Sequence, residues 1–265
     1  MSADELVVTL VAVAAGPVAW AVWLFRARWA QQVRRSGSLD VVAGALAASA
    51  LLIIVVLRTI ASFDVVDDIG YQFMYLVLGL AWLRIAQTAF AFAGLSAQDD
   101  VVERGNGAAA IALAGALVGA ALCYGGGNIG DGPGWWVVVF SAGLSTLTSL
   151  ALWIVLTLCS PVADAVAIDR DPATGTRLAG FLIALGLVLG RGVAGDWISG
   201  PQTIADFTVA LPTAAVILAM AIAVERFARP TADRPHGSIV ALGILPALAY
   251  LAIAVAGVQA LGWPA

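Results

Sequence analysis

The stretch "ERGNGAAAIALAGALVGAAL", residues 103–122, joins a short polar turn to a long run without charge. The turn is Gly105-Asn106-Gly107, and the run that follows consists mainly of alanine, leucine and glycine. About 20 apolar residues in a helix cross the ~30 Å hydrocarbon core of a bilayer. An Asn at the cap can accept hydrogen bonds from the free backbone N–H groups of the first turn. The stretch therefore predicts a membrane-spanning helix that begins sharply at a polar cap.

The composition extends this prediction to the whole chain. Of 265 residues, 62% are hydrophobic and 11% are charged, whereas soluble proteins have roughly 45–50% apolar and about 25% charged residues. The sequence predicts an all-α polytopic membrane protein, a single membrane domain over 1–265. Eight apolar runs have spanning length, at about 5–25, 40–62, 71–94, 107–124, 135–158, 177–197, 203–224 and 238–262. They pair into hairpins at about 5–62, 71–124, 135–197 and 203–262.

The arginines predict the orientation of the chain, which contains no lysine. They occupy alternate loops: Arg26, Arg28, Arg34, Arg35, Arg104, Arg170, Arg177, Arg226, Arg229 and Arg234. The opposite loops carry aspartates instead: Asp64, Asp67, Asp68, Asp131 and Asp196. Because basic residues concentrate in cytoplasmic loops, we expect a multi-pass protein of the cell inner membrane with both termini outside. The acidic start, Met1 to Glu5, is unlike a cleaved signal, so we expect the first run to be retained as a helix.

Small polar residues recur before every second apolar run, on the arginine side. They are Ser36-Gly37-Ser38, Gly105-Asn106-Gly107, Ala173-Thr174-Gly175-Thr176 and His236-Gly237-Ser238. This recurrence predicts four tandem two-helix hairpins with one orientation, which are parallel repeats about an axis along the membrane normal. The pairs Gly115-x-x-x-Gly119 and Gly186-x-x-x-Gly190 permit close backbone approach. We therefore expect the even-numbered spans to make the tight inner contacts.

Residues 103–122, together with "RDPATGTRLAGFLIALGLVLGRGVAGDW" at 170–197, resemble the YjfL-like inner-membrane family, a domain of unknown function. That family is similar in having a four-helix unit of two hairpins with an Asn-Thr-Ala-Ala type opening. Asn106-Gly107-Ala108-Ala109 matches this opening apart from Gly107, whereas Gly175-Thr176-Arg177-Leu178 lacks the Asn. The resemblance covers about 71–197, so the chain looks like a version expanded by one hairpin at each end. It implies an envelope role beside stress proteins or polyamine-related metabolism, and it assigns no functional residue.

One arginine is predicted to lie deep inside a span. Arg84 is 13 residues from Tyr71, roughly 20 Å along a helix, and an arginine at a helix centre costs about 2.5–3.5 kcal/mol on insertion scales. Two readings stay open: a structural arginine satisfied by hydroxyls and carbonyls, or a functional polar site. The residues of the second reading are Arg84, Gln87 and Thr88 with a hydroxyl stripe on the fifth run, Ser141, Ser145, Thr148 and Ser149.

Two further arginines, Arg58 and Arg191, lie near the outer ends of their runs. A long side chain at that depth can reach the interface. Asp196 and Asp206 are at a similar level. We therefore expect interfacial or ion-paired arginines there.

Two functions remain open. The first is a transport-like bundle for an ion or small solute with its polar site around Arg84. The second is a non-catalytic scaffold that recruits a cytoplasmic stress or polyamine-related partner through its basic loops. An enzyme is not expected, because H-E-x-x-H, G-x-S-x-G and paired intramembrane carboxylates are all missing from the predicted spans. No metal, cofactor or nucleic acid is expected; the expected partners are the lipid bilayer and, as an open alternative, a second copy of the chain.

Overall fold

The computed structural model describes residues 2–31, 37–231 and 238–262. Arg34, Arg35, Ser36, Arg234 and His236, which figured in the sequence predictions, lie outside the described residues. The described chain is helical and contains no strand. Among the described residues, eight helices are long and apolar enough to cross a membrane, which confirms the eight predicted spans and is compatible with an integral membrane protein.

Three spans change helical geometry along their length. The first runs through α1 (Ala3–Val13), the π-helical η1 (Ala14–Val18) and α2 (Ala19–Ala30). The seventh runs through α10 (Gly200–Phe207), the 3₁₀ turn η3 (Thr208–Ala210) and α11 (Leu211–Ala228), and the eighth through η4 (Ile239–Ile244) and α12 (Leu245–Leu261). Pro17, Pro212 and Pro246 lie at these changes. Each proline removes one backbone donor and displaces the preceding turn, which accounts for the altered helical geometry.

The other five spans are continuous helices: α3 (Ser38–Thr59), α5 (Ile69–Phe92), α6 (Gly107–Gly126), α7 (Trp135–Cys159) and α9 (Pro172–Gly192). Three short elements lie in the connections: α4 (Phe63–Val66), η2 (Ala97–Glu103) and α8 (Val162–Ala167).

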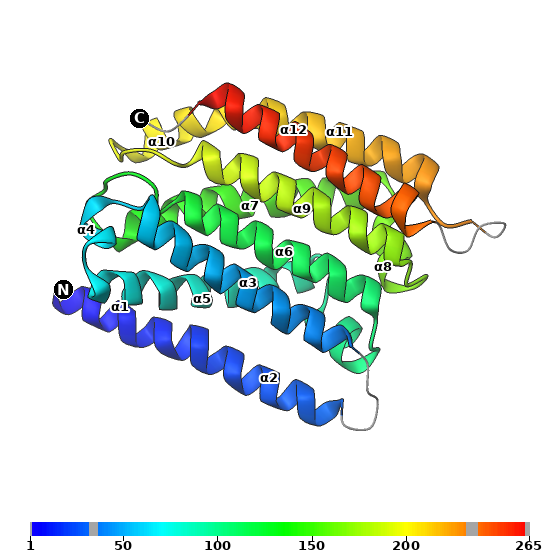
Figure 1. The fold of residues 1–265 in the computed structure, drawn as a ribbon, viewed down its shortest axis with the longest axis horizontal. Helices are drawn as coiled ribbons and strands as arrows, with labels where there is room; N and C mark the ends of the chain where they lie inside the picture. Colours follow the sequence, from blue (N-terminus) through cyan, green and yellow to red (C-terminus); the bar gives the residue numbers. More distant parts are fainter. Residues whose placement is uncertain (1, 32–36, 232–237, 263–265) are drawn as a thin grey trace.

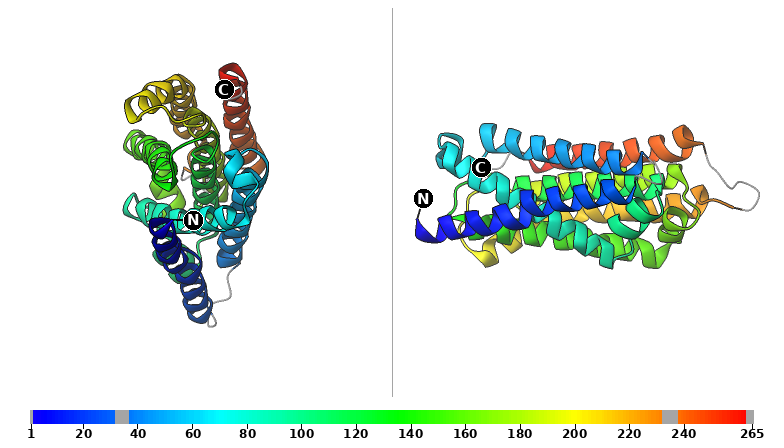
Figure 2. Two further views of the ribbon diagram at one scale, coloured as in Figure 1. Left: turned by 90° about the vertical axis from the view of Figure 1, so that its left-hand side faces the viewer. Right: turned by 90° about the horizontal axis from the view of Figure 1, so that it is seen from below.

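The second, fourth, sixth and eighth spans, which are the even-numbered ones, form a row in the order α3, α6, α9, α12 (Figure 1). The first span packs on α5 at one edge, α7 packs on α6 and α9, and α11 packs on α9 and α12 at the other edge. The end-on view in Figure 2 shows α6 near the middle of the molecule with other helices around it. The tight inner contacts are thus made by even-numbered spans, as the sequence predicts.

Backbone contact between α6 and α9 forms the centre. A Cβ on Gly190 would lie 2.5 Å from the carbonyl oxygen of Leu122, and one on Gly175 would lie 2.5 Å from that of Ala108. Gly119 and Gly186 approach each other's helix equally closely. Since the contact positions rise together along both helices, α6 and α9 run parallel, and glycine is required where they touch.

The outer faces are apolar. Large hydrophobic side chains such as Leu10, Phe25, Phe92, Leu158 and Phe227 are exposed on them. In an 18-residue apolar stretch of each span, 72% of the residues are buried in α6 and 78% in α9, whereas 28% are buried in the first span and 22% in the last. Exposed apolar faces around a core of small residues are what a lipid environment favours.

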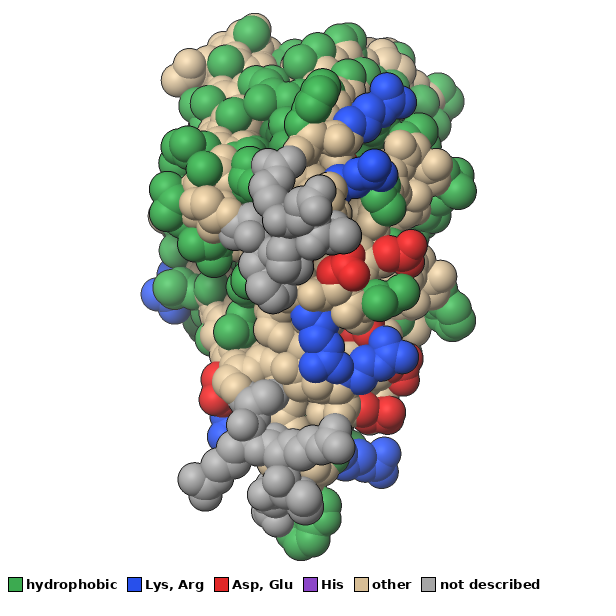
Figure 3. Space-filling model, turned by 90° about the vertical axis from the view of Figure 1, so that its right-hand side faces the viewer, with side chains coloured by type: hydrophobic (Ala, Val, Ile, Leu, Met, Phe, Trp, Pro, Cys, Tyr) green, Lys and Arg blue, Asp and Glu red, His purple; other side chains and the backbone are tan. Residues whose placement is uncertain are grey.

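The two ends of the bundle differ in charge. One, the aspartate-bearing end, holds the described chain termini and Asp64, Asp67, Asp68, Asp131 and Asp196 (Figure 1). The other, the arginine-bearing end, holds Arg28, Arg104, Arg170, Arg226 and Arg229. Figure 3 looks at this end and shows arginine and carboxylate side chains interleaved across it. The arginines of the described loops therefore gather at one end, as the sequence predicts, although aspartates such as Asp99, Asp164 and Asp169 lie at that end too.

The sixth span was predicted at 177–197, and its predicted start is wrong, because the helix begins before residue 177 by about one and a half turns. The helix begins at Pro172, with Asp171 as its N-cap, so Ala173-Thr174-Gly175-Thr176 lies inside it. The Asp171 carboxylate accepts the backbone N–H of Thr174 at 2.9 Å, and proline at the first helical position needs no N–H partner. The consequence is that Arg177 is a helix residue, and its side chain is fully buried.

Candidate functional site

Arg84 lies between α5 and α2. Its guanidinium carbon is 5.5 Å from the ring centre of Trp20 and 5.9 Å from that of Trp23. It also donates to the side-chain oxygen of Gln87, and the hydroxyl of Thr88 donates to the Arg84 carbonyl at 3.0 Å. Arg84 is half-buried and is eight residues from the end of α5 at Phe92. Aromatic faces and an amide thus satisfy this arginine.

The hydroxyl stripe of α7 lies elsewhere. Ser141, Ser145 and Ser149 are buried, but Ser145 donates to the carbonyl of Ser141 at 2.9 Å and Thr148 to that of Leu144 at 2.8 Å, both within their own helix. The polar contact between α5 and α7 is made by the Trp82 indole N–H, which donates to Thr146 at 3.1 Å. Arg84 contacts the first span, so the structure does not bring it together with the stripe.

Within the described residues, neither Arg58 nor Arg191, at the aspartate-bearing end, pairs with the predicted acids. Arg191 donates to the carbonyl of Gly262 at 2.7 Å, beyond the end of α12. Asp196 accepts the backbone N–H of Asp131 at 2.8 Å, and Asp206 accepts from Gln202 at 2.8 Å. Arg58 is exposed in the last turn of α3. None of these residues takes part in an ion pair within the described chain.

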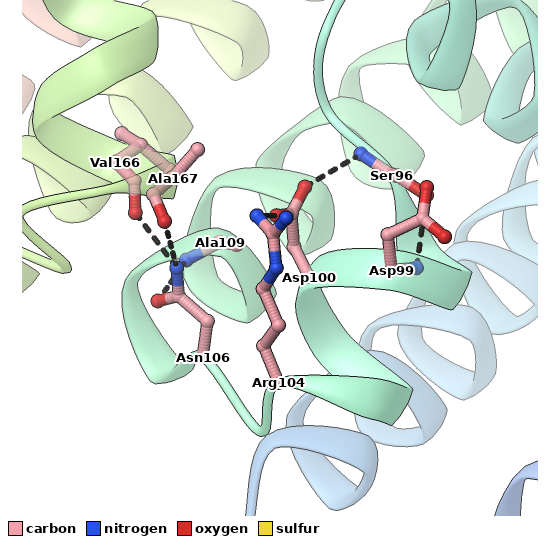
Figure 4. Close-up of polar contacts among 8 residues, drawn as sticks. All are labelled: Ser96, Asp99, Asp100, Arg104, Asn106, Ala109, Val166 and Ala167. Atoms are coloured by element: carbon pink, nitrogen blue, oxygen red, sulfur yellow. Dashed lines mark hydrogen bonds and ion pairs between the residues drawn. The ribbon is translucent and has the colours of Figure 1, made fainter.

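The turn before α6 is a structural tether. Asn106 caps α6 by accepting from Ala109 at 3.1 Å, and its amide donates to the Val166 carbonyl of α8 at 2.8 Å (Figure 4). The buried Asp100 accepts the backbone N–H of Ser96 and pairs with Arg104 at 3.1 Å. The polar turn at 105–107 therefore joins the second and third hairpins at the arginine-bearing end.

The start of α9 carries the most deeply buried charges of the described chain. Arg177 makes a bidentate ion pair with Glu225 of α11, each N–O distance being 2.8 Å. Its other terminal nitrogen donates to the Leu242 carbonyl of η4 at 2.6 Å. Side-chain exposure is 0% for Arg177 and 4% for Glu225. One guanidinium therefore links the sixth, seventh and eighth spans.

The network continues from Arg177 to the helix cap. Arg177 donates to the Thr174 hydroxyl at 2.9 Å, and that hydroxyl donates to Asp171 at 2.6 Å. We call Asp171, Thr174, Arg177 and Glu225 the α9 network. It contains two carboxylates and one guanidinium, and the free N–H groups at the start of α9 offset part of the excess negative charge.

Two buried oxygens near this network lack a partner. They are the second carboxylate oxygen of Asp171 and the hydroxyl of Tyr250, whose ring packs edge-on against Phe181 at 6.3 Å. Buried polar atoms are normally hydrogen-bonded. The α9 network thus has acceptor capacity that the protein itself does not use.

A cavity of about 350 Å³ opens beside the network at the arginine-bearing end. Asp164, Ala165, Asp169 and Arg229 line it. The Ala165 carbonyl accepts the backbone N–H of Asp171 at 3.0 Å, and Arg229 follows Glu225 by four residues. The α9 network therefore lies next to an opening at that end, while the glycine contact of α6 with α9 continues toward the other end.

Sequence reasoning missed this site for a local reason. Placing the helix start at residue 177 put Arg177 in a loop and left Glu225 one residue beyond the seventh predicted run. The pair Asp171-Pro172 would have indicated the correct helix start, because Asp is a preferred cap and Pro a preferred first residue of a helix. With that start, Arg177 falls one and a half turns into an apolar helix and needs an acidic partner.

Within the described ranges, no group of three or more His, Cys, Asp or Glu side chains could hold a metal ion. The chemistry that the arrangement offers is charge pairing, proton exchange at a carboxylate and cation binding. Comparison with protein-family models, curated proteins and solved structures found no match to this chain.

Proposed function

We propose that the chain is a transport-like integral membrane protein that moves an ion or a small solute, and that the α9 network is its responsive site. The observation that carries the proposal is the Arg177–Glu225 pair, which is fully buried within two spans. Charges inside membrane spans are costly, face the protein interior and mark ion or proton pathways. A cation or proton fits best, because the network has two carboxylates for one arginine.

The geometry favours this site over Arg84. Arg177 connects three spans, so a change in the pairing of Glu225 alters contacts among all three. In the described part of the chain, the Arg84 side chain contacts Gln87 of its own helix and two tryptophans of the first span. We therefore move the proposed polar site from Arg84 and the α7 hydroxyls to the α9 network.

The four-repeat arrangement is part of the proposal. The row of even-numbered spans supports it, and so does a shared cap geometry. The N–H of Asn106 bonds the carbonyl of Asp100, and that of Asp171 bonds Ala165, both six residues back. A residue with positive φ precedes each cap, Gly105 at 61° and Arg170 at 53°.

This cap geometry pairs Asn106 with Asp171, and so Gly107-Ala108-Ala109 with Pro172-Ala173-Thr174. That pairing differs from the one drawn from the YjfL-like opening, which set Asn106 against Gly175. We also keep three expectations from the sequence as proposals: a relationship to the YjfL-like family, an orientation with both termini outside, and a non-enzymatic role.

The experiment is flux in proteoliposomes for protons, potassium, chloride and spermidine. We expect the wild type to exceed empty liposomes for at least one cation. Glu225→Gln removes the charge but keeps the shape, and we expect it to abolish that flux at equal incorporation. Flux that is unchanged in Glu225→Gln would move the site away from the network.

A scaffold is the second candidate, and one observation favours it. The exposed arginine-bearing end interleaves both signs of charge (Figure 3), which suits recognition of a charged protein partner. Two results together would favour the scaffold. The wild type would show no flux of any of the four solutes, and a protein would co-purify in stoichiometric amount and be lost when Arg226 and Arg229 are changed to Gln.

A further inference from the structure

A second polar cavity lies at the aspartate-bearing end, opposite the α9 network. Its volume is about 170 Å³, and it is bordered by the start of α1, by α4 and α5, by the loop after α6 and by the start of α7. Glu5, Asp64, Tyr71, Tyr75 and Asn128 are among its lining residues. Drug-sized sites occupy roughly 300–1,000 Å³, so this cavity suits a smaller molecule.

The charge around the cavity is negative. Glu5 and Asp64 line it, and no arginine does so. Asp131 adjoins it, because the Ser62 hydroxyl is within hydrogen-bond distance of both Asp131, at 2.8 Å, and Asp64. One hydroxyl proton can serve only one of these two carboxylates. None of the three acids is in an ion pair within the described residues.

The side-chain oxygen of Asn128 is a second, independent indication of a ligand, because it lacks a hydrogen-bond donor. The residue is 5% exposed, and its amide nitrogen donates to the Tyr124 carbonyl at 2.8 Å. Its side-chain oxygen has no hydrogen-bond partner, although the residue lines the cavity. A buried amide oxygen without a donor is unfavourable, so a donor that enters the cavity would find an unused acceptor.

We infer that this cavity binds a small primary ammonium ion, R–NH₃⁺. Its three N–H groups can be shared among the unused oxygen of Asn128 and the carboxylates of Asp64 and Glu5, the last of which already accepts the Ser2 N–H at 2.6 Å. The rings of Tyr71 and Tyr75 offer apolar contact to the attached alkyl group and cation–π contact to the ammonium group. A bare metal ion fits less well, since no group of three metal-binding side chains exists in the described chain. The inference goes beyond the proposed function and needs no flux.

The test uses the full chain in detergent with ethylammonium chloride as the probe. Binding is measured by calorimetry and by the rise in unfolding temperature that a ligand of the native state produces. Sodium chloride at equal ionic strength and tetramethylammonium chloride, which has no N–H, are the comparison salts. We expect saturable stabilisation by ethylammonium and at least about tenfold weaker binding of tetramethylammonium, because charged hydrogen bonds are lost.

Two matched variants locate the site. Asp64→Asn removes a lining carboxylate, whereas Asp67→Asn removes an exposed carboxylate of the same end that does not line the cavity. We expect the dissociation constant for ethylammonium to rise at least about tenfold in Asp64→Asn and to stay within twofold of the wild type in Asp67→Asn. Equal stabilisation by all three salts, or equal weakening in both variants, would overturn the inference.

Discussion

The centre of the bundle and its first edge hold their helices together by different means. At the centre, α6 and α9 touch through glycine backbones, and Arg177 ties α9 to α11 and η4 with a fully buried ion pair. At the edge, the first span meets α5 through one glycine, Gly16, and through tryptophans that cover Arg84. Both regions contain an arginine within a candidate membrane span; in the described residues Arg177 pairs with a carboxylate and Arg84 does not.

The difference shows at which arginine the loss of a partner should cost the most stability. A half-buried arginine under aromatic rings can lose its partners and still reach the interface. A buried pair cannot, because removing one partner leaves an uncompensated charge. The following substitutions use this contrast.

Glu225→Ala should have the largest effect. It leaves Arg177 buried without its partner, so we expect the free energy of unfolding to fall by about 3–5 kcal/mol. The measurement is equilibrium unfolding in detergent micelles. Replacement of both residues by Met should recover stability to within about 1 kcal/mol of the wild type; a double variant as unstable as Glu225→Ala would contradict the pairing.

Gly186→Ala tests the backbone contact at the centre. The added Cβ would run into the Gly119 backbone, so we expect a loss of about 1–3 kcal/mol in the same unfolding measurement. Gly44→Ala on α3 is the matched control, since a Cβ there meets nothing within 4 Å. The control should gain up to about 1 kcal/mol, because alanine favours helix. Similar losses for both would mean that α6 and α9 do not touch in this way.

Asn106→Ala removes the cap of α6 and the bond to α8. We expect a cost of about 1–2 kcal/mol and faster amide exchange at Ala109, whose N–H loses its acceptor. Ser238→Ala removes the exposed cap of η4, with a bond of 3.3 Å to Ala241, and should cost less than Asn106→Ala. A larger cost at Ser238 would show that the Asn106 tether is not formed.

Arg84→Met should have the smallest effect. It loses cation–π contact with Trp20 and Trp23, each about 0.5–1 kcal/mol, and gains an apolar side chain in a lipid setting. The net change in the free energy of unfolding should be within about 1 kcal/mol, with tryptophan fluorescence altered. A loss as large as that of Glu225→Ala would place an essential charge at the edge instead of the centre.

Sequence alone could predict much of the fold and little of the site. Apolar run length was enough to predict eight helices, because bilayer thickness and backbone hydrogen bonding leave few alternatives. The distribution of arginine was enough to predict that the loop arginines gather at one end. Asn106 was recognised as a cap because it stands at an abrupt change from polar to apolar residues.

The site could not be predicted because it depends on a five-residue shift of the helix start and on contacts between residues distant in the chain. Ala173 and Thr174 resemble a polar turn, yet Asp171 starts the helix. Arg177 and Glu225 are 48 residues apart, and no local pattern reveals that α9 and α11 face each other there. Arg84 and the α7 hydroxyls share a depth by residue count, but helix rotation directs them to different neighbours.

The most direct measurement of the central claim is cation flux through the double variant Arg177→Met/Glu225→Met in proteoliposomes, beside the wild type and Arg84→Met at matched incorporation. The double variant should fold, so loss of flux reports function and not instability. The account predicts a fall of at least about tenfold for the double variant and a rate within twofold of the wild type for Arg84→Met. Full flux in the folded double variant would contradict the account and make the buried pair a structural tie.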